Sequence, residues 1–138
     1  MKGLPTLIRV HQWKLEEMRR NLGELEGLRA DLEQQLRNLH IQHTEEQRLA
    51  AESTEFAFTY NGYAHSFMYR REKLHQSIAE VEDALTNARA QVQEAFQEVK
   101  KYETVHERNV RKEYELEIRR EQIALDEAGL QMHRASAG

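Results

Sequence analysis

Residues 55–69 read EFAFTYNGYAHSFMY and contain six of the nine Phe and Tyr residues of the chain. They also contain Asn61-Gly62, a strong turn dipeptide because both residues tolerate positive φ. Segments with helical periodicity and almost no helix breakers extend on both sides of this stretch. Two long helices joined by a short break are expected to pack as an antiparallel hairpin. The stretch therefore predicts a chain reversal near residue 62.

The aromatic side chains of this stretch have two interpretations from sequence. They could anchor a binding partner at the tip of the hairpin, or they could close the end of the helical seam by packing over it. The backbone of residues 56–65 could be a loop, a helix break or a small β-hairpin. The alternation of Phe56, Phe58 and Tyr60 before Asn61-Gly62 suits a β-hairpin, but an isolated two-stranded hairpin is marginal in water.

The composition of the 138 residues indicates long helices rather than a layered globular core. Charged residues make up 32% and hydrophobic residues 39%, with one Pro and six Gly. Such a balance is typical of a coiled coil with a narrow apolar stripe on each helix. The 20 basic and 24 acidic residues are interspersed and leave a net charge of −4, which disfavours nucleic acid as a partner.

Apolar residues recur with the 3-4 spacing of a heptad seam in both halves of the chain. The first seam begins at Leu15 and weakens beyond Leu39, where His43 and Glu46 occupy seam positions. The second seam is clear up to Tyr102. A further stripe appears on another face of the second helix, where its members are expected to be partly exposed. The first seam comprises Leu15, Met18, Leu22, Leu25, Leu32, Leu36 and Leu39. The second comprises Leu74, Ile78, Val81, Leu85, Ala88, Val92, Ala95, Val99 and Tyr102. The further stripe comprises Val110, Tyr114, Ile118 and Leu125.

These patterns predict an all-α fold with one domain, a single antiparallel coiled-coil hairpin over residues 1–138. The first helix is expected over about residues 6–55, the turn region over 56–65, the second helix over 66–128 and a frayed tail over 129–138. A turn at residue 62 would pair Leu39 with Leu85, Leu25 with Val99 and Leu22 with Tyr102. Arms of about 50 residues would give a rod of about 75 Å.

The sequence offers no constellation for catalysis or for a cofactor. It has no Gly-rich phosphate loop and no Cys, so nucleotide binding and thiolate chemistry are not expected. His40 and His43 have a spacing that can bind a metal, but no further ligand completes the site, so they are interpreted as helix-surface histidines. Catalysis needs a water-excluding cleft, which a two-helix rod lacks. A non-enzymatic protein is therefore expected, without catalytic, cofactor-binding or metal residues.

Several short segments resemble one known family. Lys100-Lys101-Tyr102-Glu103 and Ala124-Leu125-Asp126-Glu127, each with its following residues, are similar to the second helix of the flagellar export protein FliJ family in its alphaproteobacterial branch. Arg70-Arg71-Glu72 after an aromatic-rich break and the Lys-Gly-Leu-Pro opening are also similar to that family. The length agrees, and the resemblance spans nearly the whole chain.

This resemblance implies a stalk-like coiled coil, similar to the stalk of rotary ATPases, in the cytoplasmic part of the flagellar type III export apparatus. It implies contacts with the hexameric export ATPase, the cytoplasmic domain of the membrane export gate and export chaperones, and a role in flagellum assembly and motility. The positions that match the family's gate-contacting surface are Gln35, Leu39 and Phe67, and Tyr60 and Tyr63 are added as aromatic candidates. The stripe of Val110, Tyr114, Ile118 and Leu125 is the candidate ATPase-binding surface.

The resemblance implies a location in the cytoplasm, peripheral on the cytoplasmic side of the inner membrane. No window approaches 18 consecutive apolar residues and the N-terminal sequence lacks a secretory signal, so neither a transmembrane helix nor a secretory signal is expected. Two alternatives remain at this point. One is a prefoldin-type molecular chaperone subunit, which would require a β-hairpin between the helices. The other is a generic structural coiled coil that dimerises end to end.

Overall fold

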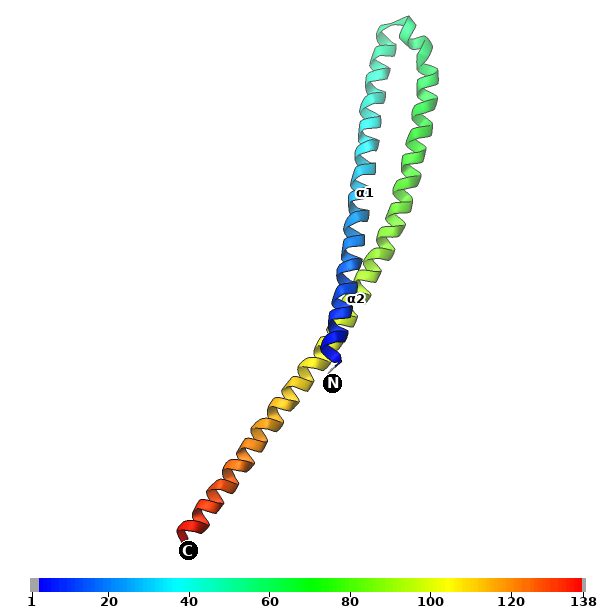
Figure 1. Cartoon of the computed structure of the whole chain (residues 1–138). Coiled ribbons are helices and arrows are strands. Elements are labelled where there is room, and N and C mark those ends of the chain that lie inside the picture. The colour runs from blue at the N-terminus through cyan, green and yellow to red at the C-terminus, as the bar shows by residue number, and fades with distance from the viewer. Residues whose placement is uncertain (1–2, 138) are drawn as a thin grey trace. The chain divides into compact units, whose positions relative to one another are not determined.

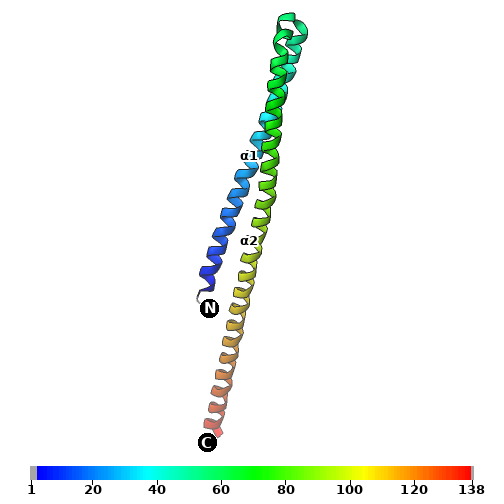
Figure 2. The ribbon, with the colours of Figure 1, turned by 90° about the vertical axis from the view of Figure 1, so that its right-hand side faces the viewer.

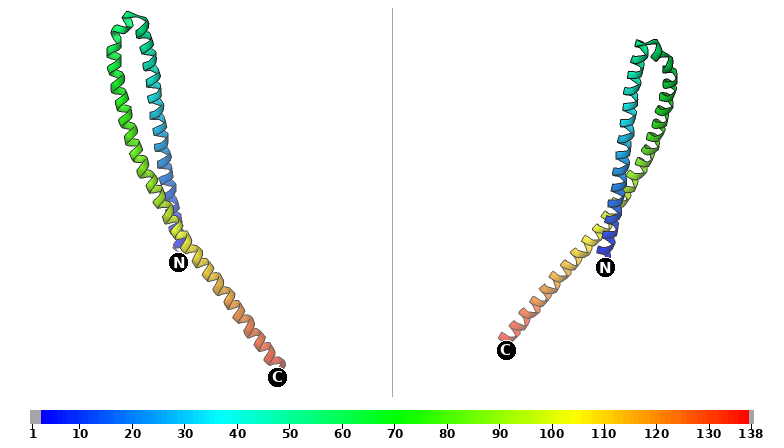
Figure 3. Two further views of the ribbon diagram at one scale, coloured as in Figure 1. Left: turned by 180° about the vertical axis from the view of Figure 1, so that it is seen from behind. Right: turned by 45° about the horizontal axis from the view of Figure 1, so that its top comes forward.

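The computed structural model describes residues 3–137, and these form two long helices with no strand among them. Helix α1 spans Leu4–Glu52 and helix α2 spans Thr54–Ala137. Figures 1 and 3 show the neighbouring parts of the two helices, coloured cyan and green, running side by side in opposite directions from the connection between them. The predicted all-α helical hairpin is confirmed.

Helix α1 begins where the local sequence can satisfy a helix terminus. Pro5 lies in the first turn, where its missing N–H would have had no helical acceptor. The Leu7 N–H donates to the Gly3 carbonyl over 3.0 Å and extends the hydrogen-bonded ladder to the residue before the helix. The helix then continues for 49 residues without interruption.

The chain reverses at Ser53 and not near Asn61-Gly62. Ser53 is the one non-helical residue between the helices, and its carbonyl accepts the first hydrogen bond of α2, from the Ala57 N–H at 3.0 Å. Ser is a favoured residue just before a helix, and Glu55 in the first turn complements the helix dipole. No described residue has positive φ, so Asn61-Gly62 simply continues the helix. The predicted turn region of residues 56–65 is therefore wrong, and so are the helix boundaries at 55 and 66.

Helix α2 is 84 residues long and continues through the segment that was expected to fray. Figure 2 shows it as one uninterrupted ribbon. Residues 129–137 are helical, which corrects the prediction of a frayed tail, while Gly138 lies outside the described residues. Residues 54–65 are helical, so they do not form the β-hairpin that the sequence left open. That hairpin was the only support for a prefoldin-type chaperone.

Contacts along the chain group it into two compact units. One consists of residues 14–95, which include the connection between the helices, and the other of residues 3–13 with residues 96–137. In the first unit, the predicted heptad positions face inward. The seam also continues past Leu39, because His43, Glu46 and Ala50 are half-buried. The buried apolar side chains of this unit are Leu15, Leu39, Phe67, Val81, Leu85 and Ala88.

The pairing of the two seams differs from the prediction because the reversal lies at Ser53. The Arg29 guanidinium contacts the Glu82 carboxylate at 3.1 Å across the helices. Four residues back along α1 correspond to four residues onward along antiparallel α2, so Leu25 lies opposite residue 86 and not opposite Val99. Leu39 lies across from Arg70 and Leu74 rather than Leu85.

The second unit has a short seam. Leu4, Ile8 and Val99 are buried in it. The His11 and Tyr102 rings stack with centroids 4.8 Å apart, so Tyr102 packs on His11 and not on Leu22 as predicted. Every residue from 110 to 137 is exposed. This part of α2 has helical structure without a described packing partner.

Candidate partner-binding surfaces

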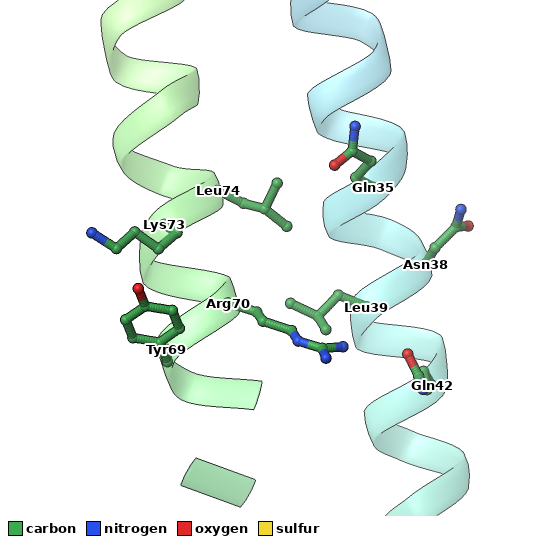
Figure 4. Close-up of a pocket in the computed structure, with 8 residues that line it drawn as sticks. All are labelled: Gln35, Asn38, Leu39, Gln42, Tyr69, Arg70, Lys73 and Leu74. Carbon is green, nitrogen blue, oxygen red and sulfur yellow. The ribbon is translucent and has the colours of Figure 1, made fainter. Parts of the chain in front are cut away.

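An open groove lies between α1 and α2 in the unit of residues 14–95 (Figure 4). Leu39 and Leu74 point into the space between the helices, and the Arg70 side chain reaches from α2 toward α1. Lys73 adds a second positive charge on α2, with its side chain pointing away from α1 (Figure 4). Such a surface, apolar inside and polar at its margin, is typical of protein-binding sites. The groove, as we call it below, is lined by Gln35, Asn38, Leu39, Gln42, Tyr69, Arg70, Lys73 and Leu74.

Next to the groove, an aromatic cluster closes the seam toward the connection between the helices. The His43 and Phe67 rings stack with centroids 3.7 Å apart, and the Tyr60 and Tyr63 rings lie about 6 Å from His43, at 6.0 and 6.1 Å. The His40 ring meets Phe67 edge-on at 5.5 Å. Phe67 is only 5% exposed. His43 is thus a half-buried residue of the seam and not the surface histidine that the sequence suggested.

Two buried polar atoms of this cluster have no hydrogen-bond partner among the described residues, namely His43 Nδ1 and the Tyr63 hydroxyl. Burial raises the pKa of the Tyr63 phenol, and the nearby Glu46 carboxylate raises it further. The cluster therefore combines stacking with unsatisfied polar groups, which is a costly arrangement in a protein interior.

The candidate gate-contacting residues consequently lie in different environments. Gln35 is exposed at the groove, whereas Leu39 and Phe67 are buried in the seam. Tyr60 and Tyr63 are half-buried in the aromatic cluster. The structure thus brings Gln35 and Leu39 together at the groove and puts Phe67, Tyr60 and Tyr63 in the neighbouring cluster.

The aromatic residues of the connecting region divide between the two interpretations made from sequence. Phe67 and the two half-buried tyrosines close the seam, while Phe58 is 88% exposed and Phe56 is 49% exposed. Sequence reasoning had not singled out Arg70 and Lys73 as groove residues. Their seam-flanking positions would have suggested it only with the correct pairing of the helices.

The candidate ATPase-contacting residues all lie on the exposed part of α2. Val110, Tyr114, Ile118 and Leu125 are between 47% and 67% exposed, and we call this set the outer stripe. No described segment covers it. Four apolar side chains along one helix exceed the scattered exposure of a typical surface and are suited to a partner.

The described residues contain no group of three His, Cys, Asp or Glu side chains placed to hold a metal ion. Within the same part of the chain, no helix is long and apolar enough to cross a membrane.

The fold and these surfaces define the class of protein as a long antiparallel helical hairpin whose exposed features suit protein partners. A family model described as "Flagellar FliJ protein" matches residues 1–138, the whole chain. The chain therefore belongs to the FliJ family and is a component of the flagellar export apparatus. Neither a curated protein nor a solved structure gives a significant match to it.

Proposed function

We propose that the protein is a non-enzymatic, stalk-like linker between the export ATPase ring and the cytoplasmic domain of the membrane export gate, on the cytoplasmic side of the inner membrane. Export chaperones are a further expected class of partner. The observation that carries the proposal is the family match over the whole chain, combined with two distinct exposed surfaces, the groove and the outer stripe.

The groove is the proposed contact for the gate. The half-buried Leu74 supplies an apolar surface between the helices, the buried Leu39 shapes the groove without being exposed in it, and Gln35 supplies an exposed amide. Arg70 and Lys73 favour a partner surface that carries carboxylates. Because Phe67 is buried against His43, we assign it the role of shaping the seam beside the groove and not that of a direct contact.

The outer stripe is the proposed contact for the ATPase. Its four side chains are exposed on a helix that has charged residues on either side of them, such as Arg111 and Glu115. Mixed apolar and charged contacts suit a surface that must bind within a protein ring and still release.

The proposal is tested by separating the two surfaces through mutation. Tyr114→Asp with Ile118→Asp is expected to weaken binding to the purified ATPase at least tenfold and to leave gate binding unchanged. Arg70→Glu with Lys73→Glu is expected to weaken binding to the soluble gate domain and to leave ATPase binding unchanged. All four side chains are exposed, so circular dichroism should show unchanged helicity.

A matched control reverses two exposed charges elsewhere, Lys14→Glu with Arg89→Glu. This pair changes the net charge by the same amount as Arg70→Glu with Lys73→Glu. It should leave both affinities within about twofold. Loss of both partners from either surface pair, with helicity intact, would contradict the assignment of separate partners to the two surfaces.

A further inference from the structure

The first part of α1 carries a face that is both apolar and cationic. Leu7, Val10 and Trp13 are 37%, 44% and 64% exposed. Arg9 and Lys14 are exposed next to them in the sequence. Trp13 is the one Trp of the chain, and most of its side chain is open to solvent. We call these five residues the Trp13 face.

The helical spacing gathers the apolar side chains of the Trp13 face on one side of α1. Each step of three residues turns back by about 60° at 3.6 residues per turn, so Leu7, Val10 and Trp13 cover an arc of about 120°. Lys14 falls inside this arc, and Arg9 lies about 40° beyond Trp13. The buried seam residues of this part of α1 fall outside the arc. The Trp13 face is therefore the convex outside of a helix and not part of the seam.

The charge of this part of α1 is positive. Residues 1–15 contain three Lys or Arg residues and no Asp or Glu. The next two residues are acidic, but each is paired within the helix. The Glu16 carboxylate contacts the Arg19 guanidinium at 2.8 Å, and the Glu17 carboxylate contacts that of Arg20 at 2.7 Å. The nearest acidic groups of α1 are thus neutralised by their own neighbours.

The adjoining part of α2 does not cancel this positive charge. Residues 96–106 lie in the same unit, and the His11 and Tyr102 rings stack where they pack on α1. These α2 residues include two basic and two acidic side chains. The cationic character of the Trp13 face therefore persists in a protein whose net charge is −4.

An anionic lipid surface has the chemistry that matches the Trp13 face. A Trp ring prefers the level of the lipid headgroups, where its apolar body and its N–H are both accommodated. Lys and Arg can bury their aliphatic stems and keep their charges at the phosphates. Helices that combine these residue types on one face lie in the plane of the membrane interface. A convex arc also suits a planar and deformable surface better than it suits a protein pocket.

We propose that the Trp13 face binds the surface of a membrane that contains anionic lipid, with the first part of α1 lying among the headgroups. This inference rests on the peripheral location given in the proposed function and names the residues that meet the lipid. Binding is reversible and salt-sensitive, because only a few apolar side chains and cations take part. It uses no side chain of the groove or of the outer stripe.

The test uses Trp13 of the full chain as its own fluorescent reporter. The protein is titrated at low salt with vesicles of phosphatidylcholine and phosphatidylglycerol, and separately with vesicles of phosphatidylcholine alone. With the anionic vesicles, Trp13 emission should shift to shorter wavelength and should be quenched by bromine-labelled acyl chains. The neutral vesicles should produce neither change. Vesicle sedimentation measures the bound fraction independently.

Variants that keep the reporter assign the binding to this face. Arg9→Glu with Lys14→Glu should weaken binding to the anionic vesicles at least tenfold, and Val10→Asp should also weaken it. The matched control Arg37→Glu with Arg89→Glu reverses two exposed charges of the unit of residues 14–95 and should bind like the wild type. Circular dichroism checks that all variants keep their helicity.

Three results would overturn the proposal. One is sedimentation with anionic vesicles without any change in Trp13 emission, which would mean that charge holds the protein through another surface. Another is equal binding by the Arg9 and Lys14 variant and the wild type. The third is a shift in emission that the ATPase or the soluble gate domain produces and vesicles do not. The vesicle assay contains neither protein, so its failure would leave the linker assignment standing, and failure of the linker assays would leave the vesicle result standing.

Discussion

At the residue scale, His43 and Tyr63 are the positions where polar side-chain atoms are buried unfavourably. Each has a buried polar atom without a hydrogen-bond partner among the described residues. They are held there by aromatic stacking, in particular by the contact between His43 and Phe67. The unfavourable burial of these polar atoms offsets part of the stacking energy. Removing the polar atom while keeping the ring should therefore stabilise the fold.

Tyr63→Phe tests this balance. Without the unsatisfied hydroxyl, we expect the free energy of unfolding at pH 7 to increase by about 1 kcal/mol. Burial raises the pKa of Tyr63 above its ordinary value of 10.0, so the native state disfavours the phenolate. The corresponding stability is present below the unfolded-state pKa and is lost as pH rises through the folded-state pKa.

Denaturant unfolding as a function of pH is the measurement. The variant should lose less stability than the wild type above pH 10, whereas the exposed Tyr69→Phe should match the wild type. Identical alkaline profiles for Tyr63→Phe and the wild type would show that the phenol is not desolvated.

Leu85 is the most deeply buried side chain, at 1% exposure. Truncation to Ala leaves a cavity in the seam, and we expect Leu85→Ala to lower the free energy of unfolding by about 2–5 kcal/mol. Leu28 is 46% exposed on α1, so Leu28→Ala should change it by no more than about 0.5 kcal/mol. Thermal melts followed by circular dichroism compare the two, and equal midpoints would contradict the burial assigned to Leu85.

At the element scale, the start of α2 determines how the two helices pair. Ser53 and Glu55 give a helix start that outweighs the turn tendency of Asn61-Gly62. A Gly costs only about 1 kcal/mol inside a helix, and a long packed helix tolerates this cost. The reversal therefore lies at the start of α2 and not at the most flexible dipeptide.

Gly62→Ala distinguishes a chain reversal at Ser53, with Gly62 inside α2, from a turn near residue 62. Gly62 has negative φ in α2, and a Cβ built there meets no atom within 4 Å. We expect Ala to stabilise the protein by about 1 kcal/mol, measured by denaturant unfolding. Gly23→Ala, at a similarly open helical position of α1, should have the same sign. If Gly62→Ala destabilised the protein and Gly23→Ala did not, the result would support a turn near residue 62 and contradict the reversal at Ser53.

The sequence predicted the helices and their inward faces because a 3-4 repeat leaves little freedom in what is buried. It did not predict the partner of each seam residue, since pairing depends on the position of one connecting residue. The reversal lies at Ser53 and not near residue 62, and this difference moved the partner of Leu39 from Leu85 to Leu74. For the same reason, the positions of Arg70 and Lys73 at the groove could not be predicted. Gln35 and Leu39 line the groove, and their role as gate contacts stays a prediction made from the family resemblance.

At the scale of the whole molecule, stability is unevenly distributed. Buried side chains occur from Leu4 to Val99, and none occurs from residue 110 to 137. Isolated helices gain most of their stability in proteins from packing, so the last part of α2 should open far more readily than the seam.

Hydrogen exchange of the free, dilute protein tests this difference. We expect amides of residues 110–137 to exchange at least a hundredfold faster than those of residues 78–92. Binding of the ATPase should slow exchange around Tyr114 and Ile118 in particular. Equal protection of the two segments in the dilute monomer would mean that another part of the chain covers the end of α2.

The single non-helical residue between α1 and α2 has a practical consequence. Proteases cleave most easily where a chain can become extended, and Ser53, between Glu52 and Thr54, is the one such internal place in the described chain. Within the unit of residues 14–95, a glutamate-specific protease should therefore cut after Glu52 before it cuts at any other Glu of that unit. Since the arms interact through side chains along the seam, the two fragments should remain associated. The hairpin could then be reassembled from two separately expressed peptides, each carrying its own label.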